Sequence, residues 1–291
     1  MASNHFPNQR YLKRSVTSDF VFIIMTEIQD KVSLTSQYMA AVRAVENRRA
    51  DRLFSDPFAQ KLAGEKIMSE IAPAIKKYED RGRPVVAVRT RFFDDFLMSS
   101  SVSGIRQVII LGAGMDTRAF RLPWHPDTHL YELDQPEVIQ LKESLLNVTS
   151  AKCCRDSISI DLRQDWSKKL IAQGFETSSP SIWLLEGLLY YLNPADVRIL
   201  LNTISDLSTD GSMLGADLLN EKMRQSDNGF AKYWESGCNE PEKFLDQFGW
   251  QASVVQYGDD TASFGRFNYK FPPREVADIA RGFLVTAKKK K

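Results

Sequence analysis

Two glycines and one acidic residue form the clearest chemical pattern in the sequence. Gly112 and Gly114 stand directly after an apolar run, residues 107–111. Glycines in such a turn let the backbone pass close to a ligand, and the helix that follows would offer free N–H groups to an anion. Asp134 ends the next apolar segment about 20 residues later, where a carboxylate can accept both hydroxyls of a ribose. The pattern predicts a site for a ligand that contains adenosine.

The residue at position 117 bears on which adenosine-containing ligand binds. A dinucleotide fingerprint would place a third glycine there to let the pyrophosphate approach, but the chain has Thr117. This favours S-adenosylmethionine and leaves an NAD(P)-binding oxidoreductase as the alternative from a different class. A tight turn that binds nothing would use the same two glycines. The turn alone therefore does not distinguish a binding site from a structural feature.

Two further carboxylates follow apolar runs in the same way. Asp161 and Leu162 come after the third run, and Glu186 comes after the fourth. Either carboxylate could instead cap a helix. As binding groups, Asp161 would meet the exocyclic amine of adenine with Leu162 against the ring, and Glu186 would place negative charge near a sulfonium. Together with Asp134, three acids at equivalent places favour the binding interpretation.

The runs that position these residues alternate with helical patterns. The expected strands cover residues 107–111, 129–133, 157–160, 181–185, 213–216, 252–256 and 282–286. The expected helices cover residues 38–45, 85–97, 137–146 and 194–207, and one more that begins at Asp56-Pro57 with Asp56 as its N-cap. This alternation predicts a Rossmann-like α/β fold, a parallel sheet with helices on both faces. Ligands are expected beyond the carboxyl ends of the strands.

The chain divides into three predicted parts. Residues 1–24 are expected to form an extension, either disordered or laid on the surface. Residues 25–104 are expected to form a helical cap, and residues 105–291 the Rossmann-like core with a lid insertion near residues 220–245. The cap and the lid insertion would then enclose the bound acceptor.

Several segments resemble the leucine carboxyl methyltransferases and their bacterial relatives, which are S-adenosylmethionine-dependent O-methyltransferases. These segments are residues 56–59, 88–95, 111–118, 132–136, 186–192 and 283–287. The resemblance implies the class I methyltransferase fold, with a seven-stranded, mostly parallel sheet and a helical N-terminal lid. It also implies S-adenosyl-L-methionine as the cofactor.

The same resemblance implies a role for individual residues. The expected cofactor contacts are Gly112 and Gly114 along the cofactor, Asp134 at the ribose, Asp161 and Leu162 at the adenine, and Glu186 at the methionine end. Arg89 would pair with the cofactor carboxylate through its planar guanidinium. Arg91 points about 200° away on the same helix. It is expected to pair with Asp94 or Asp95.

Fewer residues in the sequence indicate where the methyl acceptor binds. Tyr190 and Tyr191 are the candidate catalytic residues, and Asp116 and Asp217 are further candidates on that side. Methyl transfer from a sulfonium mainly requires alignment and exclusion of water. A carboxylate acceptor needs no base, whereas an alcohol or phenol would benefit from one. We expect a small-molecule acceptor, a natural-product intermediate, with a protein C-terminal carboxylate as the alternative.

Composition argues against several other classes of protein. The formal net charge is +1, which gives no indication of a nucleic-acid partner. The apolar run at residues 20–25 is too short to span a bilayer, so we expect no membrane partner and a cytoplasmic monomer or homodimer. Cys153, Cys154 and Cys238 form no CxxC pair, and neither a disulfide framework nor a metal site is expected.

Overall fold

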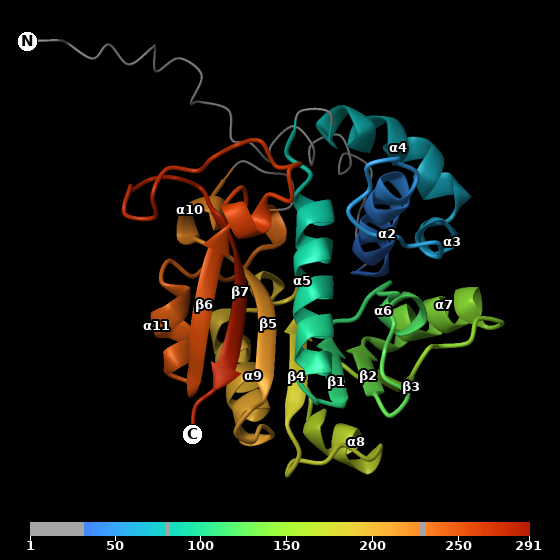
Figure 1. Cartoon of the computed structure of the whole chain (residues 1–291), viewed down its shortest axis with the longest axis vertical. Helices are drawn as coiled ribbons and strands as arrows, with labels where there is room; N and C mark the ends of the chain where they lie inside the picture. The colour runs from blue at the N-terminus through green and yellow to red at the C-terminus, as the bar shows by residue number, and fades with distance from the viewer. Residues whose placement is uncertain (1–31, 80–81, 227–230) are drawn as a thin grey trace, which may run out of the picture.

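The computed structural model describes residues 32–79, 82–226 and 231–291, and the predicted extension at residues 1–24 lies outside them. These described residues form one seven-stranded sheet in the order β3-β2-β1-β4-β5-β7-β6, with helices on both faces (Figure 1). β1 to β5 pair in parallel, and β7 is antiparallel to both of its neighbours. The strands are β1 (Gln107–Leu111), β2 (His129–Asp134), β3 (Cys154–Ser159), β4 (Ser181–Leu185), β5 (Met213–Leu219), β6 (Trp250–Gln256) and β7 (Gly282–Lys289).

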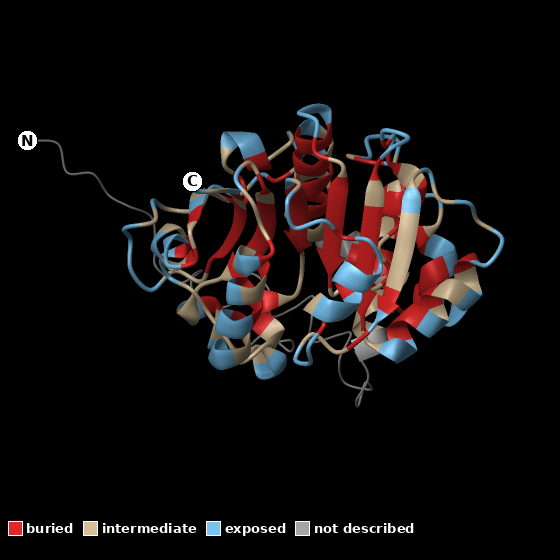
Figure 2. Ribbon diagram, turned by 90° about the horizontal axis from the view of Figure 1, so that it is seen from below, coloured by how far each residue is buried: buried red, intermediate tan, exposed pale blue. Residues whose placement is uncertain are grey.

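Successive apolar side chains of β1 point to opposite faces of the sheet, so both faces must be covered by helices. Val108 and Ile110 pack into one core cluster, and Ile109 and Leu111 pack into the other. The first face is covered by α2 (Val32–Asn47), α3 (Ala59–Ala63), α4 (Glu65–Glu79), α5 (Val85–Val102) and α7 (Pro136–Leu146). The second face is covered by α8 (Ser167–Ala172), α9 (Pro194–Asp206) and α11 (Pro241–Asp246). Figure 2 shows the buried strands between helices whose outer sides are exposed.

Several short helical turns lie near the carboxyl ends of the strands. They are α6 (Arg118–Arg121), α10 (Glu221–Arg224) and the 3-10 turns η2 (Leu189–Tyr191), η3 (Ala231–Tyr233) and η4 (Asp260–Ala262). α6 follows the glycine turn after β1, and η2 follows β4. These turns carry several side chains of the cavity described below.

Several boundaries differ by a few residues from those expected from the sequence, and two of these differences have a clear physical reason. β3 spans Cys154–Ser159 rather than residues 157–160. It is the edge strand, so its first half is polar and half-exposed and lacks the apolar run that marks the central strands. The helix expected from Asp56-Pro57 was wrong in its start, because α3 begins at Ala59 with Phe58 as its N-cap residue. The Asp56 carboxylate accepts hydrogen bonds from Arg43 and Thr117 at 2.9 and 2.8 Å, and from the Phe58 N–H, which precedes the helix, at 3.3 Å.

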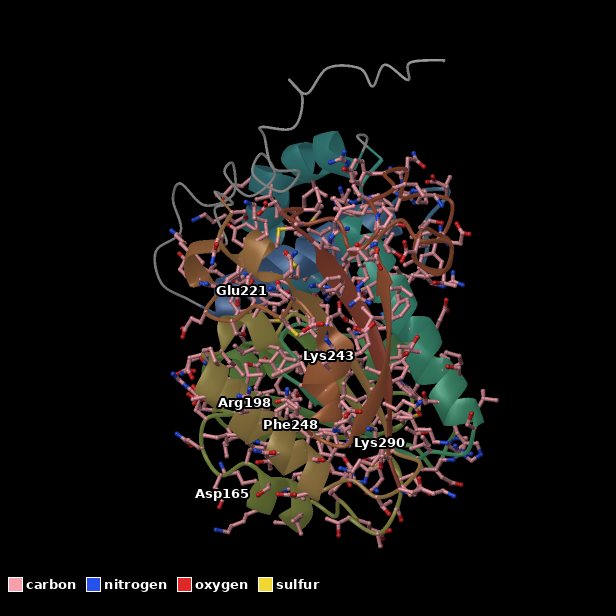
Figure 3. The ribbon with its side chains drawn as sticks, turned by 90° about the vertical axis from the view of Figure 1, so that its left-hand side faces the viewer. Asp165, Arg198, Glu221, Lys243, Phe248 and Lys290 are labelled. Carbon is pink, nitrogen blue, oxygen red and sulfur yellow. The ribbon has the colours of Figure 1, made fainter. Side chains whose placement is uncertain are left out.

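The outer side of α9 and α11 is a charged, solvated surface. Arg198 on α9 lies with its guanidinium 5.8 Å from the centre of the Phe244 ring on α11, and Lys243 is 76% exposed. Arg198 and Lys243 are labelled in Figure 3, which views this side of the molecule. None of the helices formed by the described residues is long and apolar enough to cross a membrane.

Candidate functional site

A cavity of about 980 Å³ lies at the carboxyl ends of the parallel strands. The structure brings these residues predicted for the site to its wall: Arg89, Gly112, Gly114, Asp116, Asp134, Asp161, Leu162, Glu186, Tyr190 and Tyr191. Asp217, the other acceptor-side candidate, is buried and hydrogen-bonded to Tyr190 and does not line the cavity. Helix α2 adds Ser36, Met39 and Arg43. Tyr233 and Glu235, from the segment predicted as a lid insertion, complete the wall. Both the expected helical cap and the expected lid insertion therefore contribute side chains to one cavity.

Gly112, Gly114 and Asp134 form what we call the glycine wall. Gly112 and Gly114 have φ values of +65° and +50°, which L side chains rarely adopt. A Cβ on Gly112 would lie 3.0 Å from the Leu188 side chain, and one on Gly114 would lie 3.1 Å from Ser36. The turn itself therefore requires both glycines, and it brings backbone to the cavity surface.

Asp134 connects the second strand to this turn. Its Oδ2 accepts a hydrogen bond from the Gly114 N–H at 2.6 Å, and its Oδ1 accepts one from the Gln135 N–H at 2.7 Å. Burial raises the pKa of Asp134 above its usual value, while these two N–H groups partly oppose that rise. A carboxylate has about four acceptor positions, so capacity remains for two hydroxyl donors. The side chain therefore fits the ribose diol of an adenosyl ligand.

Arg163, two residues later in the sequence, holds the Asp161 carboxylate in place by hydrogen bonds. The carboxylate accepts hydrogen bonds from the Arg163 backbone N–H and from the Arg163 Nε, both at 2.9 Å. These bonds from Arg163 lower the pKa of Asp161, which is therefore ionised at neutral pH. Leu162 lines the cavity beside it. The sequence did not predict the Arg163 contact.

A second group of residues is made up of ion pairs, and we call it the arginine cluster. Its members are Arg89, Arg118, Arg121, Asp94, Asp116, Glu186 and Asp217. Arg89, from α5, donates through Nε to Glu186 at 2.9 Å and through Nη1 to Asp217 at 2.7 Å. Burial tends to lower the pKa of Arg89, but the charge of Asp217 and other neighbours raises it well above its usual value. Arg91 lies on another side of α5 and pairs with Asp95 at 2.8 Å, as its spacing predicted.

Arg118, like Arg121, was not predicted from the sequence as a site residue. It is 3% exposed and contacts Asp94 at 2.7 Å, Glu186 at 2.8 Å and also Asp116. Glu186 therefore bridges Arg89 and Arg118. Burial tends to raise the pKa of Glu186, but these two guanidinium groups lower it. Arg118 belongs to a segment that resembles the methyltransferases, but its partners on α5 and after β4 are distant in sequence.

Tyr190 and Asp217 extend the cluster toward the acceptor side. The Tyr190 hydroxyl donates to Asp217 at 3.2 Å and accepts from Arg89 Nη1 at 3.1 Å. Burial and the charge of Asp217 raise the pKa of Tyr190 well above its usual value. Burial also raises the pKa of Tyr191. Both phenols are therefore neutral at physiological pH, which suits hydrogen-bond donation better than proton removal.

The chain is similar in sequence to a known family of methyltransferases. The family model for leucine carboxyl methyltransferase matches residues 36–205. A Streptomyces coelicolor protein named "Putative S-adenosyl-L-methionine-dependent methyltransferase" is 36% identical, over 83% of this chain and 90% of its own length. A Saccharopolyspora erythraea protein of the same name is 34% identical, over 90% of this chain and 97% of its own length.

Solved structures support the fold. A DUF574 family protein from Streptomyces avermitilis has a TM-score of 0.56 at 13% identity, over 86% of this chain and 96% of its own. A Thermobifida fusca protein described as "a putative methyltransferase" has a TM-score of 0.54 at 20% identity, over 87% of this chain and 94% of its own. Together with the sequence relatives, the sheet order with one antiparallel strand and the cavity at the strand ends of the described residues define a class I S-adenosylmethionine-dependent methyltransferase. The chain belongs to the leucine carboxyl methyltransferase family.

Proposed function

We propose that this methyltransferase transfers the methyl group of S-adenosylmethionine to a hydroxyl or carboxylate oxygen of a small molecule, a natural-product intermediate. The observation that carries the proposal is the single cavity that joins the glycine wall to Tyr190, Tyr191 and Tyr233. Its volume of about 980 Å³ stands near the upper end of the range for small-molecule sites, about 300–1,000 Å³. That size supports joint occupation by a methyl donor and a small acceptor.

The glycine wall supports the adenosyl end of the donor. Asp134 would accept the two ribose hydroxyls while keeping its bonds to the Gly114 and Gln135 N–H groups. Asp161 and Leu162 would border the adenine, with the carboxylate oriented by Arg163. These assignments use side chains that are already held in place, so little ordering would accompany binding.

The arginine cluster supports the methionine end. Arg89 Nη2 contacts the Met39 sulfur at 3.9 Å, and a thioether is a weak acceptor that a ligand carboxylate would readily replace. In the connected cluster, three guanidinium groups face four carboxylates, which leaves one negative charge in excess. A negative field at this place stabilises a sulfonium cation.

The neutral tyrosines bear on the acceptor chemistry. Tyr190 and Tyr191 would orient the acceptor oxygen by hydrogen bonding, and the transfer itself is an in-line displacement that needs alignment and exclusion of water. A carboxylate is already ionised at neutral pH and requires no base. An alcohol would require a base such as Glu235, which lines the cavity, or Asp217, which accepts a hydrogen bond from Tyr190.

A product analysis tests the proposal. The purified protein is incubated with S-adenosylmethionine and a panel of small carboxylic acids, phenols and alcohols, and formation of S-adenosylhomocysteine is followed with each. Mass spectrometry then locates the added methyl group, and mild alkali distinguishes a methyl ester, which is hydrolysed, from a methyl ether, which is stable. Methylation of peptide C-termini alone would contradict the proposal in favour of protein carboxyl methylation. Binding of NAD(H) without binding of S-adenosylmethionine would contradict the donor assignment as well.

A further inference from the structure

Three side chains with metal-binding atoms meet at the end of the sheet opposite the cavity. His129 is the first residue of β2, and Cys154 is the first residue of β3. The two are register partners, and Asp156 lies beside Tyr131 two residues further along. Side chains alternate along a strand, so all four point to the same face. The nitrogen, sulfur and oxygen atoms of His129, Cys154 and Asp156 lie within 4.8 Å of one another.

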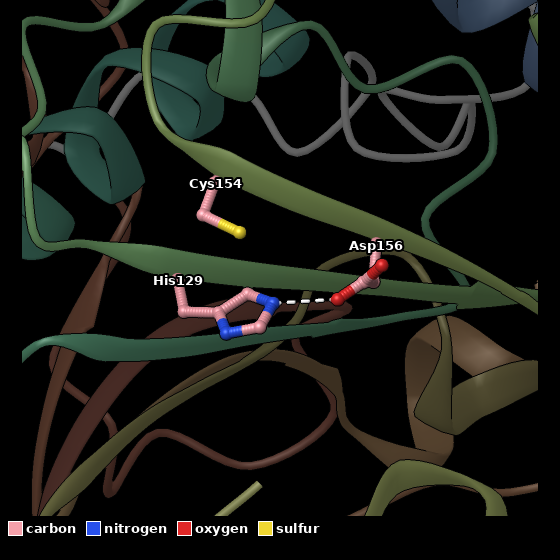
Figure 4. A group of neighbouring side chains, drawn as sticks. All are labelled: His129, Cys154 and Asp156. Carbon is pink, nitrogen blue, oxygen red and sulfur yellow. Dashed lines mark hydrogen bonds and ion pairs between the residues drawn. The ribbon is translucent and has the colours of Figure 1, made fainter. Parts of the chain in front are cut away.

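Two contacts fix the orientation of the His129 ring in this group. His129 Nε2 lies 2.6 Å from Asp156 Oδ2, and His129 Nδ1 lies 2.9 Å from the Tyr131 hydroxyl. Figure 4 shows the Cys154 side chain directed toward the space beside the His129 ring and the Asp156 carboxylate. Cys154 is exposed, and the side chains of His129 and Asp156 are 28% and 35% exposed. An ion can therefore reach the group from solvent.

We propose that His129, Cys154 and Asp156 form a zinc-binding site, with water as the fourth ligand. Imidazole and thiolate are the protein ligands that Zn²⁺ prefers, and a carboxylate commonly completes the set. Zn²⁺ would bind His129 through Nε2, while Nδ1–H donates to the Tyr131 hydroxyl and fixes the tautomer. The Cys154 thiol would lose its proton to solvent as the sulfur–zinc bond forms.

The distances require only a small adjustment. Metal–ligand bonds of about 2.0–2.3 Å place tetrahedral ligand atoms about 3.3–3.8 Å apart. The His129–Asp156 hydrogen bond would lengthen, and the more distant ligand atoms would move closer by about 1 Å. Cys154 is exposed and Asp156 is partly exposed, so side-chain rotation suffices for this movement. The strand register then holds the ligands in place.

The location determines what the ion would do. About five residues of β2 separate His129 from Asp134, which corresponds to about 16 Å along the strand. Zn²⁺ at this place would not contact the methyl donor. It would join the edge strand β3 to β2, and through these strands it would stabilise the sheet that carries the glycine wall.

Binding measurements on the full, untagged chain test the site. After treatment with a chelator, the protein is titrated with Zn²⁺ by calorimetry and with Co²⁺ by absorption spectroscopy. We expect one equivalent of each ion and a thiolate-to-cobalt charge-transfer band. Cys154→Ser should abolish the band, and both Cys154→Ser and Asp156→Asn should weaken Zn²⁺ binding by more than about 100-fold. Tyr131→Phe, which removes an outer partner, should weaken it by about 10- to 100-fold.

Cys153→Ser is the matched control. Cys153 is the adjacent residue, and its side chain packs into the core cluster on the other face of the sheet. This variant should bind Zn²⁺ as the wild-type protein does, and Zn²⁺ should raise the Tm of both but not that of Cys154→Ser. Absence of Zn²⁺ and Co²⁺ binding in the wild-type protein would overturn the proposal. Equal Zn²⁺ affinity in the wild-type and Cys154→Ser proteins would overturn it too.

Discussion

At the glycine wall the chain presents backbone to the cavity, whereas at the arginine cluster it presents ion pairs. Gly114 and Asp134, on consecutive strand ends, are joined by one backbone-to-side-chain hydrogen bond of 2.6 Å. The arginine cluster instead joins α5, α6, the end of β4 and β5 through buried charges. Losing one hydrogen bond to a buried N–H costs about 1–3 kcal/mol. Removing one cation from a buried charge network leaves several carboxylates less fully paired and costs about 3–5 kcal/mol. The two regions should therefore respond differently to substitution.

The largest expected effect is on folding and comes from Arg118. Arg118→Met leaves Asp94, Asp116 and Glu186 without their shared buried partner. We expect the free energy of unfolding to fall by about 3–5 kcal/mol, measured by urea denaturation. The control is Lys168→Met, which breaks the exposed pair with Asp165 and should change the free energy of unfolding little. Equal losses in the two variants would show that the arginine cluster is not a stabilising network.

Asp134→Ala tests the glycine wall, and here the effect should be on binding. Loss of charge-assisted bonds to two ribose hydroxyls should weaken S-adenosylmethionine binding by about 2–3 kcal/mol, roughly 30- to 150-fold. Calorimetry on the folded variant measures this change. Asp127→Ala, at a position whose side chain is 81% exposed, serves as the control. An unchanged affinity in folded Asp134→Ala would refute the ribose assignment.

Acid should weaken the arginine cluster through Asp116. Burial tends to raise the pKa of Asp116, but the charge of Arg118 and other neighbouring cations lowers it from 3.8 to about 2. A lowered pKa in the folded state contributes stability above the unfolded pKa, and this contribution is lost as the pH falls toward about 2. The contribution is about 2 kcal/mol. The difference in unfolding free energy between the wild-type protein and Asp116→Asn should shrink by that amount between about pH 5 and pH 2. A constant difference would show that Asp116 does not titrate in this way.

The smallest effect distinguishes two arginines of α5. Arg89→Lys keeps the charge but loses the planar fork, so S-adenosylmethionine binding should weaken about tenfold, or about 1.4 kcal/mol. Arg91→Lys should change the affinity little, because Arg91 pairs with Asp95 and its side chain is 39% exposed. Calorimetry on both variants gives the comparison. The reverse order of affinities would place Arg91 in the donor site.

Much of the fold followed from local patterns. Buried parallel strands such as β1 and β4 are continuous apolar runs, so their bounds were predicted correctly. The start of β3 was missed because an edge strand has few buried positions, and its residues Cys154, Arg155 and Asp156 carry no apolar signal. For the same reason the proximity of His129, Cys154 and Asp156 was not foreseen: it depends on the pairing register of two strands about 25 residues apart.

The sequence by itself determined the glycine turn, the acid at the end of the next strand and the alternation of strands and helices. Each of these depends on neighbours within one strand-turn-helix unit, where backbone conformation and side-chain period are local properties. Only the tertiary structure decided that Arg118, Asp94 and Glu186 share one buried network. It likewise decided that Asp56 binds Thr117 rather than capping a helix. The physical reason is that a buried charge is paired with whichever opposite charge the packing brings near. The spacing of residues in the sequence does not predict which partner that is.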